Sequence, residues 1–225
     1  MAPPRRELES FDKPCVLAVE GEDQYYLLRH VLCVCSLSDS FDVVRLKGVT
    51  QLRPFLGTAL VTTGFDGVQA LGVMRDAEEQ RQDTCVPAAA SALQSVADAF
   101  RDVLGVAGLT SHAQVMAGEV AGRPLRVGAF IAPDGVRAGM LEDLCLSTAP
   151  VRASEALRCV DYYLECLGKA NVLRPTWPKR RLHAYLAACE EPGKKLGEAA
   201  RAGYLHLDDP VWNPLKQFLR DLAGS

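Results

Sequence analysis

Short apolar runs alternate with segments of helical periodicity through the first half of the chain, and this alternation restricts the possible folds more than any other feature. Three runs are rich in β-branched residues, which predicts buried strands over Cys15–Glu20, Phe41–Leu46 and Val68–Met74. A helical pattern follows each strand, over Gln24–Ser36, over Val49–Thr62 with an interruption near Pro54, and over Pro87–Leu104. Strands separated by helices of about 10–15 residues favour parallel βαβ units with right-handed crossovers. The sequence therefore predicts an α/β fold with a mostly parallel sheet flanked by helices.

The second half of the chain begins with a hairpin and is then helical. Val115–Glu119 and Leu125–Ile131 predict two strands joined by a turn at Ala121-Gly122-Arg123. Helical patterns follow at Ala138–Ser147, Ala153–Leu167, Pro178–Cys189, Lys195–Ala202 and Pro214–Leu222. We expect an α/β core over residues 13–148 and a helical C-terminal portion over residues 149–225, packed on the core as a single compact unit.

Composition excludes several classes of protein. Hydrophobic residues make up 48% of the 225, enough to form a substantial core, so most of the chain is not disordered. No apolar run reaches the length of a membrane span, and no apolar stretch follows the basic residues at the N-terminus, so we expect a cytoplasmic protein without a membrane segment or secretory signal. The net charge of -3 argues against nucleic-acid binding through bulk charge, although a local basic groove is compatible with it.

The eight cysteines are scattered along the chain. The one close pair, Cys33 and Cys35, has neither the spacing of a zinc knuckle nor that of a dithiol redox motif. We therefore interpret the cysteines as reduced, small core residues and predict no zinc site.

Acidic residues lie at the ends of the predicted strands. Glu20 ends the first strand, Asp76 and Glu78 follow the third, and Glu142 with Asp143 follow the second strand of the hairpin. The carboxyl ends of parallel strands meet at one edge of a sheet, where ligands bind. Crowded carboxylates repel one another unless a cation lies among them, and their oxygens favour Mg²⁺ or Mn²⁺. Two such ions suit phosphodiester cleavage. The alternative is that these are ordinary surface acids, since Asp and Glu also favour helix starts.

Gly21 directly follows Glu20. A residue without a Cβ allows a sharp turn and the close approach of a phosphate or a metal to the backbone. We therefore expect Gly21 to contribute to the same site.

Four segments occur in an order that resembles a known fold. They are Val19-Glu20-Gly21, GVMRDAEE over residues 72–79, GMLEDL over 139–144 and PKRRLHAYLA over 178–187. Together they resemble the TOPRIM fold of topoisomerases, bacterial primases, recombination proteins and OLD-type nucleases. The chain is most similar to stand-alone TOPRIM-like proteins of unknown function, and the resemblance extends from about Cys15 to Leu222. It implies a TOPRIM-like, Rossmann-like core and a metal-dependent nuclease that acts on DNA or RNA.

The resemblance also implies roles for individual residues. Glu20 matches the TOPRIM glutamate that binds metal or acts as a general acid or base. Asp76 and Glu78 match the DxD motif that holds Mg²⁺. Glu142, with Asp143, matches the additional acid that OLD-type nucleases use toward a second ion. Lys179 matches a lysine that stabilises charge developing on the phosphate.

The chain departs from the family pattern at two positions. Glu78 replaces the second aspartate of DxD and is longer by one methylene. Gln24 replaces the acid usually found four residues after the glutamate, and Asp23 lies one position earlier, a rotation of about 100° on a helix. These departures leave open a catalytically degenerate module that binds nucleic acid or a partner without turnover. A primase-type nucleotidyl transferase is disfavoured because the chain has no recognisable zinc module or partner-contacting domain.

The densest basic cluster contains Lys179, Arg180 and Arg181, with Arg174 and Trp177 just before it. These cations are placed to bind a nucleic-acid backbone, and Trp177 offers a stacking face. The alternative is a solvated helix face with a buried tryptophan. His183 lies on the same face as Lys179, and we interpret it as a helix-surface residue.

Possible partners follow from what the sequence lacks. The chain contains no phosphate-binding loop of the G-x-x-x-x-G-K-[ST] type. OLD-type proteins couple a TOPRIM domain to an ATPase, so the resemblance implies a separately encoded ATPase as a possible partner. The apolar, cysteine-rich helices also leave room for a homodimer interface.

Overall fold

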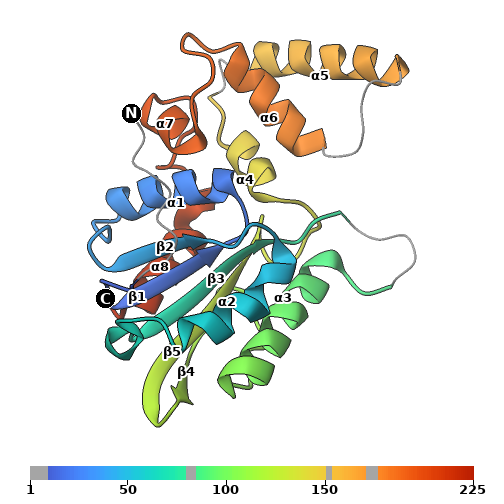
Figure 1. Ribbon diagram of the computed structural model, residues 1–225. Helices are drawn as coiled ribbons and strands as arrows, with labels where there is room; N and C mark the ends of the chain where they lie inside the picture. The colour runs from blue at the N-terminus through green and yellow to red at the C-terminus, as the bar shows by residue number, and fades with distance from the viewer. Residues whose placement is uncertain (1–9, 80–84, 151–153, 171–176) are drawn as a thin grey trace.

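A sheet of five strands forms the centre of the molecule (Figure 1). The computed structural model describes residues 10–79, 85–150, 154–170 and 177–225, without the side chain of Trp177. The strands are β1 (Cys15–Val19), β2 (Phe41–Arg45), β3 (Ala70–Asp76), β4 (Val115–Val120) and β5 (Arg123–Ala132), in the spatial order β2-β1-β3-β5-β4. All neighbouring pairs are parallel except β4 with β5, which form the antiparallel hairpin. The predicted α/β fold with a mostly parallel sheet is confirmed.

Helices cover both faces of this sheet. The first half of the chain provides α1 (Glu22–Val34), η1 (Val49–Gln51), α2 (Leu52–Ala59), η2 (Phe65–Gly67), α3 (Ala88–Ala99) and the π-helical turn η3 (Phe100–Leu104). The second half provides α4 (Leu141–Ser147), α5 (Ser154–Lys169), α6 (Trp177–Ala187), α7 (Leu196–Arg201), η5 (Pro210–Trp212) and α8 (Asn213–Ala223). Figure 1 shows α2 and α3 on one side of the sheet and α1 with α8 on the other.

The helical segment after β2 is divided near Pro54, as expected: the 3₁₀ turn η1 ends at Gln51 and α2 begins at Leu52. Pro54 is the third residue of α2 and lies in its first turn. The proline does not break α2 itself, because the first N–H groups of a helix have no partner within the helix.

Alternate residues of each strand pack into two separate hydrophobic clusters. Leu17 and Met74 belong to the cluster beneath α1 and α8, whereas Ala18 and Val73 belong to the cluster beneath α2 and α3. A parallel strand buried on both faces is apolar throughout rather than alternating, which is why these runs are continuous in the sequence.

Helix α8 lies very close to the sheet. Phe218 is fully buried, and its ring lies 5.9 Å from that of Phe130 on β5. A Cβ at Gly128 would lie 2.9 Å from Cε2 of Phe218, and one at Gly72 would overlap Leu222. Both glycines are therefore needed for the close approach of α8.

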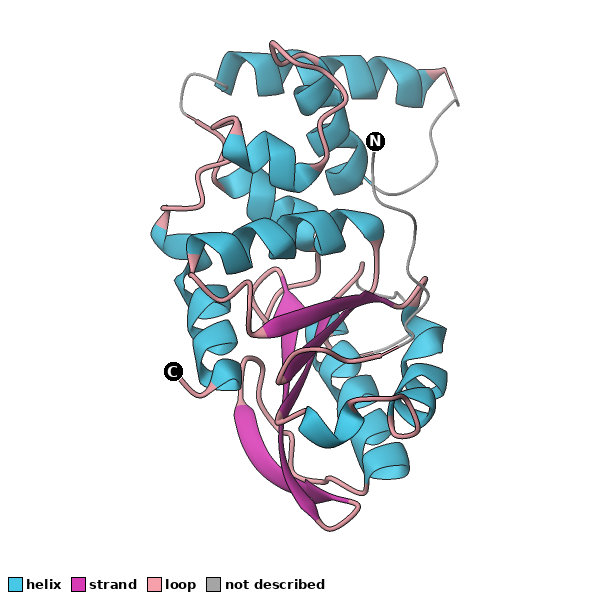
Figure 2. Ribbon diagram, turned by 60° about the vertical axis from the view of Figure 1, so that its left-hand side comes forward, coloured by secondary structure: helices cyan, strands magenta, loops and turns pink. Residues whose placement is uncertain are grey.

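Helices α5, α6 and α7 lie beyond one end of the sheet, and the β4–β5 hairpin lies at the other (Figures 1 and 2). Helix α7 packs against α1, and α6 packs against α4 and α5. No helix among the described residues is both long enough and apolar enough to cross a membrane.

The cysteines are free, but they are not all core residues. Cys15 and Cys145 are buried, as expected. The expectation of burial is wrong for four that are exposed: Cys33, Cys85, Cys159 and Cys166. Each of these lies on the outward face of a helix or in a loop, where an apolar residue in the sequence does not indicate burial.

Candidate metal centre

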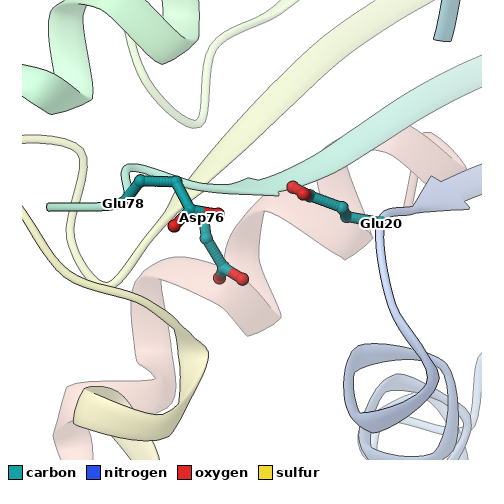
Figure 3. Close-up of side chains that lie close together, drawn as sticks. All are labelled: Glu20, Asp76 and Glu78. Atoms are coloured by element: carbon teal, nitrogen blue, oxygen red, sulfur yellow. The ribbon is translucent and has the colours of Figure 1, made fainter. Parts of the chain in front are cut away.

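Three carboxylates meet where β1 and β3 end (Figure 3). Glu20 directly follows β1, Asp76 is the last residue of β3, and Glu78 lies two residues further on. β1 and β3 are parallel neighbours, with Val19 opposite Met74, so their carboxyl ends lie side by side. One oxygen of each carboxylate lies within 4.8 Å of an oxygen of the other two. The topology thus brings together acids separated by more than fifty residues, as their positions after the strands lead us to expect.

The backbone around Glu78 fixes the shape of this site. Glu78 has a φ of 65°, in the left-handed region, which is unusual for a residue with a side chain. Its N–H donates to the carbonyl of Gly139 and its own carbonyl accepts from the Gly139 N–H, both at 2.8 Å. The Leu141 N–H in turn donates to Oδ1 of Asp76 at 2.9 Å. The segment before α4 is therefore joined to the end of β3.

Two of the three carboxylates, those of Glu20 and Asp76, lie in surroundings that disfavour their charge. Burial raises the pKa of Glu20, and the negative charge of Glu78 raises it further. Burial, followed by the nearby charge of Glu142, raises the pKa of Asp76 to about 8. Oε2 of Glu20 is buried and has no hydrogen-bond partner among the described residues. A set of carboxylate oxygens with an unsatisfied acceptor is the donor set that Mg²⁺ or Mn²⁺ prefers, so these residues fit a divalent ion.

The raised pKa of Asp76 leads to a prediction about stability in a metal-chelating buffer. Between pH 4 and 8 the folded protein holds a proton that the unfolded chain has lost, so the free energy of unfolding should fall as pH rises. One such proton gives a slope of at most about 1.4 kcal/mol per pH unit. Urea unfolding from pH 5 to pH 8 should show this fall in wild type and a smaller slope in Asp76→Asn, which keeps the Oδ1 acceptor. Equal slopes in the two proteins would contradict the assignment.

A second charged cluster lies beside the first and joins α1, α4 and α6. Nζ of Lys179 lies 3.0 Å from Oδ2 of Asp23 and 3.7 Å from Oε1 of Glu142. Nε2 of His183 lies 3.3 Å from the same Asp23 oxygen. The hydrogen bond from His183, aided by Lys179, lowers the pKa of Asp23 to about 2. His183 is an exposed residue of the α6 surface, as expected, and it also contacts the Asp23 carboxylate.

The charges of Lys179 and Glu142 respond to this cluster in different ways. Partial burial lowers the pKa of Lys179, but the hydrogen bond to Asp23 and the nearby negative charges of Asp23, Glu142 and Asp76 together outweigh that effect and raise the pKa. The amine therefore remains protonated at neutral pH. Glu142 is almost fully buried, and that burial raises the pKa of its carboxyl. Because the charge of Glu142 also acts on Asp76, the two clusters are coupled electrostatically.

The start of α1 shows what Gln24 and Asp23 contact in this structure. The side chain of Gln24 is buried, and its Oε1 accepts a hydrogen bond from the Glu20 N–H at 2.8 Å. Gln24 therefore holds the end of β1 in place, while Asp23 points toward α6. The chain bends at Glu20 and Gly21 between β1 and α1, as expected. Glycine is not required for this bend, because its φ of -129° is open to any residue and a Cβ there would meet nothing within 4 Å.

Other candidate residues have partners within the chain. Oδ2 of Asp143 accepts from the Met140 N–H at 2.9 Å and caps α4. The guanidinium of Arg181 donates twice to Asp161 on α5, at 2.6 and 2.9 Å. Arg180 is half-buried on α6. The side chain of Trp177 and all of Arg174 lie outside the described residues, so the predicted stacking face belongs to that part of the chain.

Sequence reasoning missed Arg75. It precedes Asp76 on β3, and its guanidinium acts electrostatically on Glu20, Glu78 and Asp76. Its Nε and Nη1 are buried and have no hydrogen-bond partner among the described residues. A buried donor without a hydrogen bond destabilises the folded protein by about 1–3 kcal/mol, so an arginine with two such donors needs an explanation. The sequence feature that could have indicated Arg75 is its position as a single arginine at the end of an otherwise apolar strand.

Comparisons with known proteins gave one family and two structures. A family model described as "Protein of unknown function (DUF3226)" matches residues 14–224. No curated protein matches the chain. Two structures of the C-terminal region of the Xanthomonas campestris pv. campestris OLD protein, one phased with iodine and one with mercury, are each 15% identical to it. They cover 95% of this chain and 97% and 98% of their own, with TM-scores of 0.47 and 0.48.

Proposed function

Because the chain belongs to the DUF3226 family of proteins of unknown function, we propose a function from the site itself: metal-dependent hydrolysis of phosphodiester bonds in nucleic acid, of the TOPRIM type that the sequence motifs resemble. One observation carries this proposal. Oxygens of Glu20, Asp76 and Glu78 lie within 4.8 Å of one another at the carboxyl ends of adjacent parallel strands.

In this proposal the three carboxylates hold Mg²⁺ or Mn²⁺. Glu142 lies close enough to influence the charge of Asp76 and is placed to contribute to a second ion. A divalent ion at this centre polarises a phosphoryl oxygen and lowers the pKa of the attacking water. The orphaned Oε2 of Glu20 supports this assignment, because a cation satisfies a buried acceptor that no group in the described chain satisfies.

Lys179 supplies positive charge beside this centre. Its amine is half-exposed and stays protonated, so a phosphate oxygen can accept from it without a change in protonation state. Negative charge builds up on the phosphoryl oxygens during cleavage, and a cation fixed nearby stabilises that charge. Asp23 and Glu142 hold the amine on the side of the site that faces α6. His183 in turn holds Asp23.

Metal binding tests the proposal directly. Isothermal titration calorimetry with Mn²⁺ and with Mg²⁺ should show binding by wild type and at least a tenfold weaker affinity for Asp76→Asn, about 1.4 kcal/mol. Cleavage assays on single- and double-stranded DNA and RNA should show turnover only when the ion is present. Wild-type protein that binds neither ion at millimolar concentration would overturn the proposal.

A non-catalytic module is the second candidate, and one observation favours it. At the position where the TOPRIM pattern has a further acid, Gln24 is neutral, and the neighbouring Asp23 is already bonded to both Lys179 and His183. This arrangement leaves less free negative charge for a second ion. Metal binding and nucleic-acid binding without cleavage, even after a separately encoded ATPase is added, would support this candidate.

A further inference from the structure

A small pocket opens on the α2 and α3 side of the sheet, next to the carboxylates but on the opposite side of β3 from Lys179. It has a volume of about 260 Å³ and is lined by residues of η1, α2, α3 and β3. Its polar lining consists of Arg53, Arg75, Thr50 and Ser95. Two guanidinium groups and two hydroxyls with no carboxylate in the lining are suited to an oxyanion.

Strand geometry places Arg75 toward this pocket. Met74 belongs to the cluster beneath α1 and α8, and Val73 to the cluster beneath α2 and α3. Because side chains alternate along a strand, Arg75 extends to the α2 and α3 side and Asp76 to the other. The side chain of Arg75 therefore leaves β3 on the opposite face from the side chain of Asp76, and no described group accepts a hydrogen bond from its buried Nε and Nη1.

Arg53 adds a second cation from α2. Its Nη2 lies 3.0 Å from Oδ2 of Asp102, and both side chains are about half-exposed. A guanidinium has five N–H donors, and this exposed pair occupies only one nitrogen, so Arg53 can contact an anion in the pocket at the same time. An exposed ion pair of this kind is also weak enough to rearrange.

We propose that this pocket binds a phosphate group of the nucleic-acid backbone adjacent to the phosphate that is cleaved. The inference rests on the proposed function, because it extends the same site. Arg75 and Arg53 hold the flanking phosphate on one side of the carboxylates, and Lys179 acts on the other side. The pocket is smaller than the roughly 300–1,000 Å³ of sites that enclose a whole small molecule, which suits one phosphate better than a nucleotide. The substrate is then a polynucleotide with at least one further phosphate next to the phosphate that is cleaved, and a phosphomonoester is a poor substrate.

The test measures binding separately from cleavage. Fluorescence anisotropy of a labelled single-stranded oligonucleotide, with Ca²⁺ in place of Mg²⁺, gives Kd for wild type and Arg75→Met. The variant should bind about tenfold more weakly, and its Kd should depend less steeply on salt by about one counterion. Arg220→Met removes the same charge from an exposed position on α8 and should leave Kd unchanged.

Arg53 provides a second pair of variants that leaves the buried Arg75 intact. Arg53→Gln should weaken binding several-fold. Asp102→Asn breaks the same ion pair but keeps the guanidinium, so it should bind as tightly as wild type or more tightly. This comparison holds even if Arg75→Met does not fold.

The outcomes separate the subsite from the proposed activity. If wild type cleaves nucleic acid but Arg75→Met and Arg53→Gln bind as wild type does, the subsite is wrong and the activity stands. If both variants bind the oligonucleotide more weakly but the wild type never cleaves it, the phosphate subsite is supported and the proposed hydrolytic activity is wrong. Inorganic phosphate is the competing probe: if the variants lose phosphate binding but keep the oligonucleotide Kd, the pocket is a site for free anions and the proposal is overturned. A wild type that binds neither probe overturns it as well.

Discussion

Glu20→Gln should reduce metal-dependent cleavage by about 10²–10⁴-fold, the range for the loss of a general acid or base. Glutamine has nearly the same shape as glutamate, but it is neutral and replaces one acceptor oxygen by a donor. That donor would occupy the place of Oε2, the buried oxygen that the proposed function assigns to the cation. Initial rates measured over a range of Mn²⁺ concentrations would show whether added metal recovers any activity.

The control for this variant is another glutamate at the opposite end of the sheet. Glu119 is exposed on β4 and pairs with Pro124 near the beginning of β5, whereas Asp76 pairs with Ala132 at the end of that strand. Glu119→Gln should therefore cleave at the wild-type rate. Thermal unfolding should show that Glu20→Gln is folded, since the hydrogen bond from its backbone N–H to Gln24 does not involve its side chain. A folded Glu20→Gln protein with full activity would remove Glu20 from the mechanism.

Phe218→Ala should lower the free energy of unfolding by about 3–5 kcal/mol, as expected for removing a buried aromatic ring. Its ring packs against Phe130 and reaches the sheet where Gly128 and Gly72 leave room for α8. The surrounding backbone belongs to two central strands and has little freedom to close the cavity. Urea denaturation of wild type and variant would measure the difference.

An exposed apolar residue serves as the comparison for Phe218. Val61 is 85% exposed, and Val61→Ala should change the free energy of unfolding by no more than about 0.5 kcal/mol. A loss for Phe218→Ala as small as this would mean that α8 is not docked on the sheet in solution.

Much of the fold can be predicted from the sequence because its strands and helices have distinct periodicities. All five strands and the helices after Pro133 begin within a few residues of the expected positions. Rules that assign a structure to a single proline or glycine fail where the backbone at that residue does not need the special property of the residue. Pro54 lies in the first turn of α2, where no helical hydrogen bond is lost, so it marks the start of α2 and does not break it. The chain bends at Gly21 with a φ that any residue can adopt, so the bend does not depend on glycine.

The candidate site could be predicted only as far as strand topology determines it. The positions of Glu20 and Asp76 follow from the rule that parallel strands end at one edge. The contacts among Asp23, Lys179 and His183 depend on the packing of α6 near α1, which no local pattern encodes. Arg75 was missed for the same reason, since its significance lies in the pocket formed by α2 and α3.

The order of these parts along the chain has a consequence for how the protein is made. During synthesis Glu20 leaves the ribosome first, Asp76 follows, and Lys179 emerges only after most of the chain. The sheet face that α8 covers stays uncovered until Phe218 and Leu222 are released. A nascent chain that ends between Glu78 and Lys179 therefore has all three acids but neither the lysine nor a covered sheet face. On the proposed function, the carboxylates exist before the cation that would act beside them.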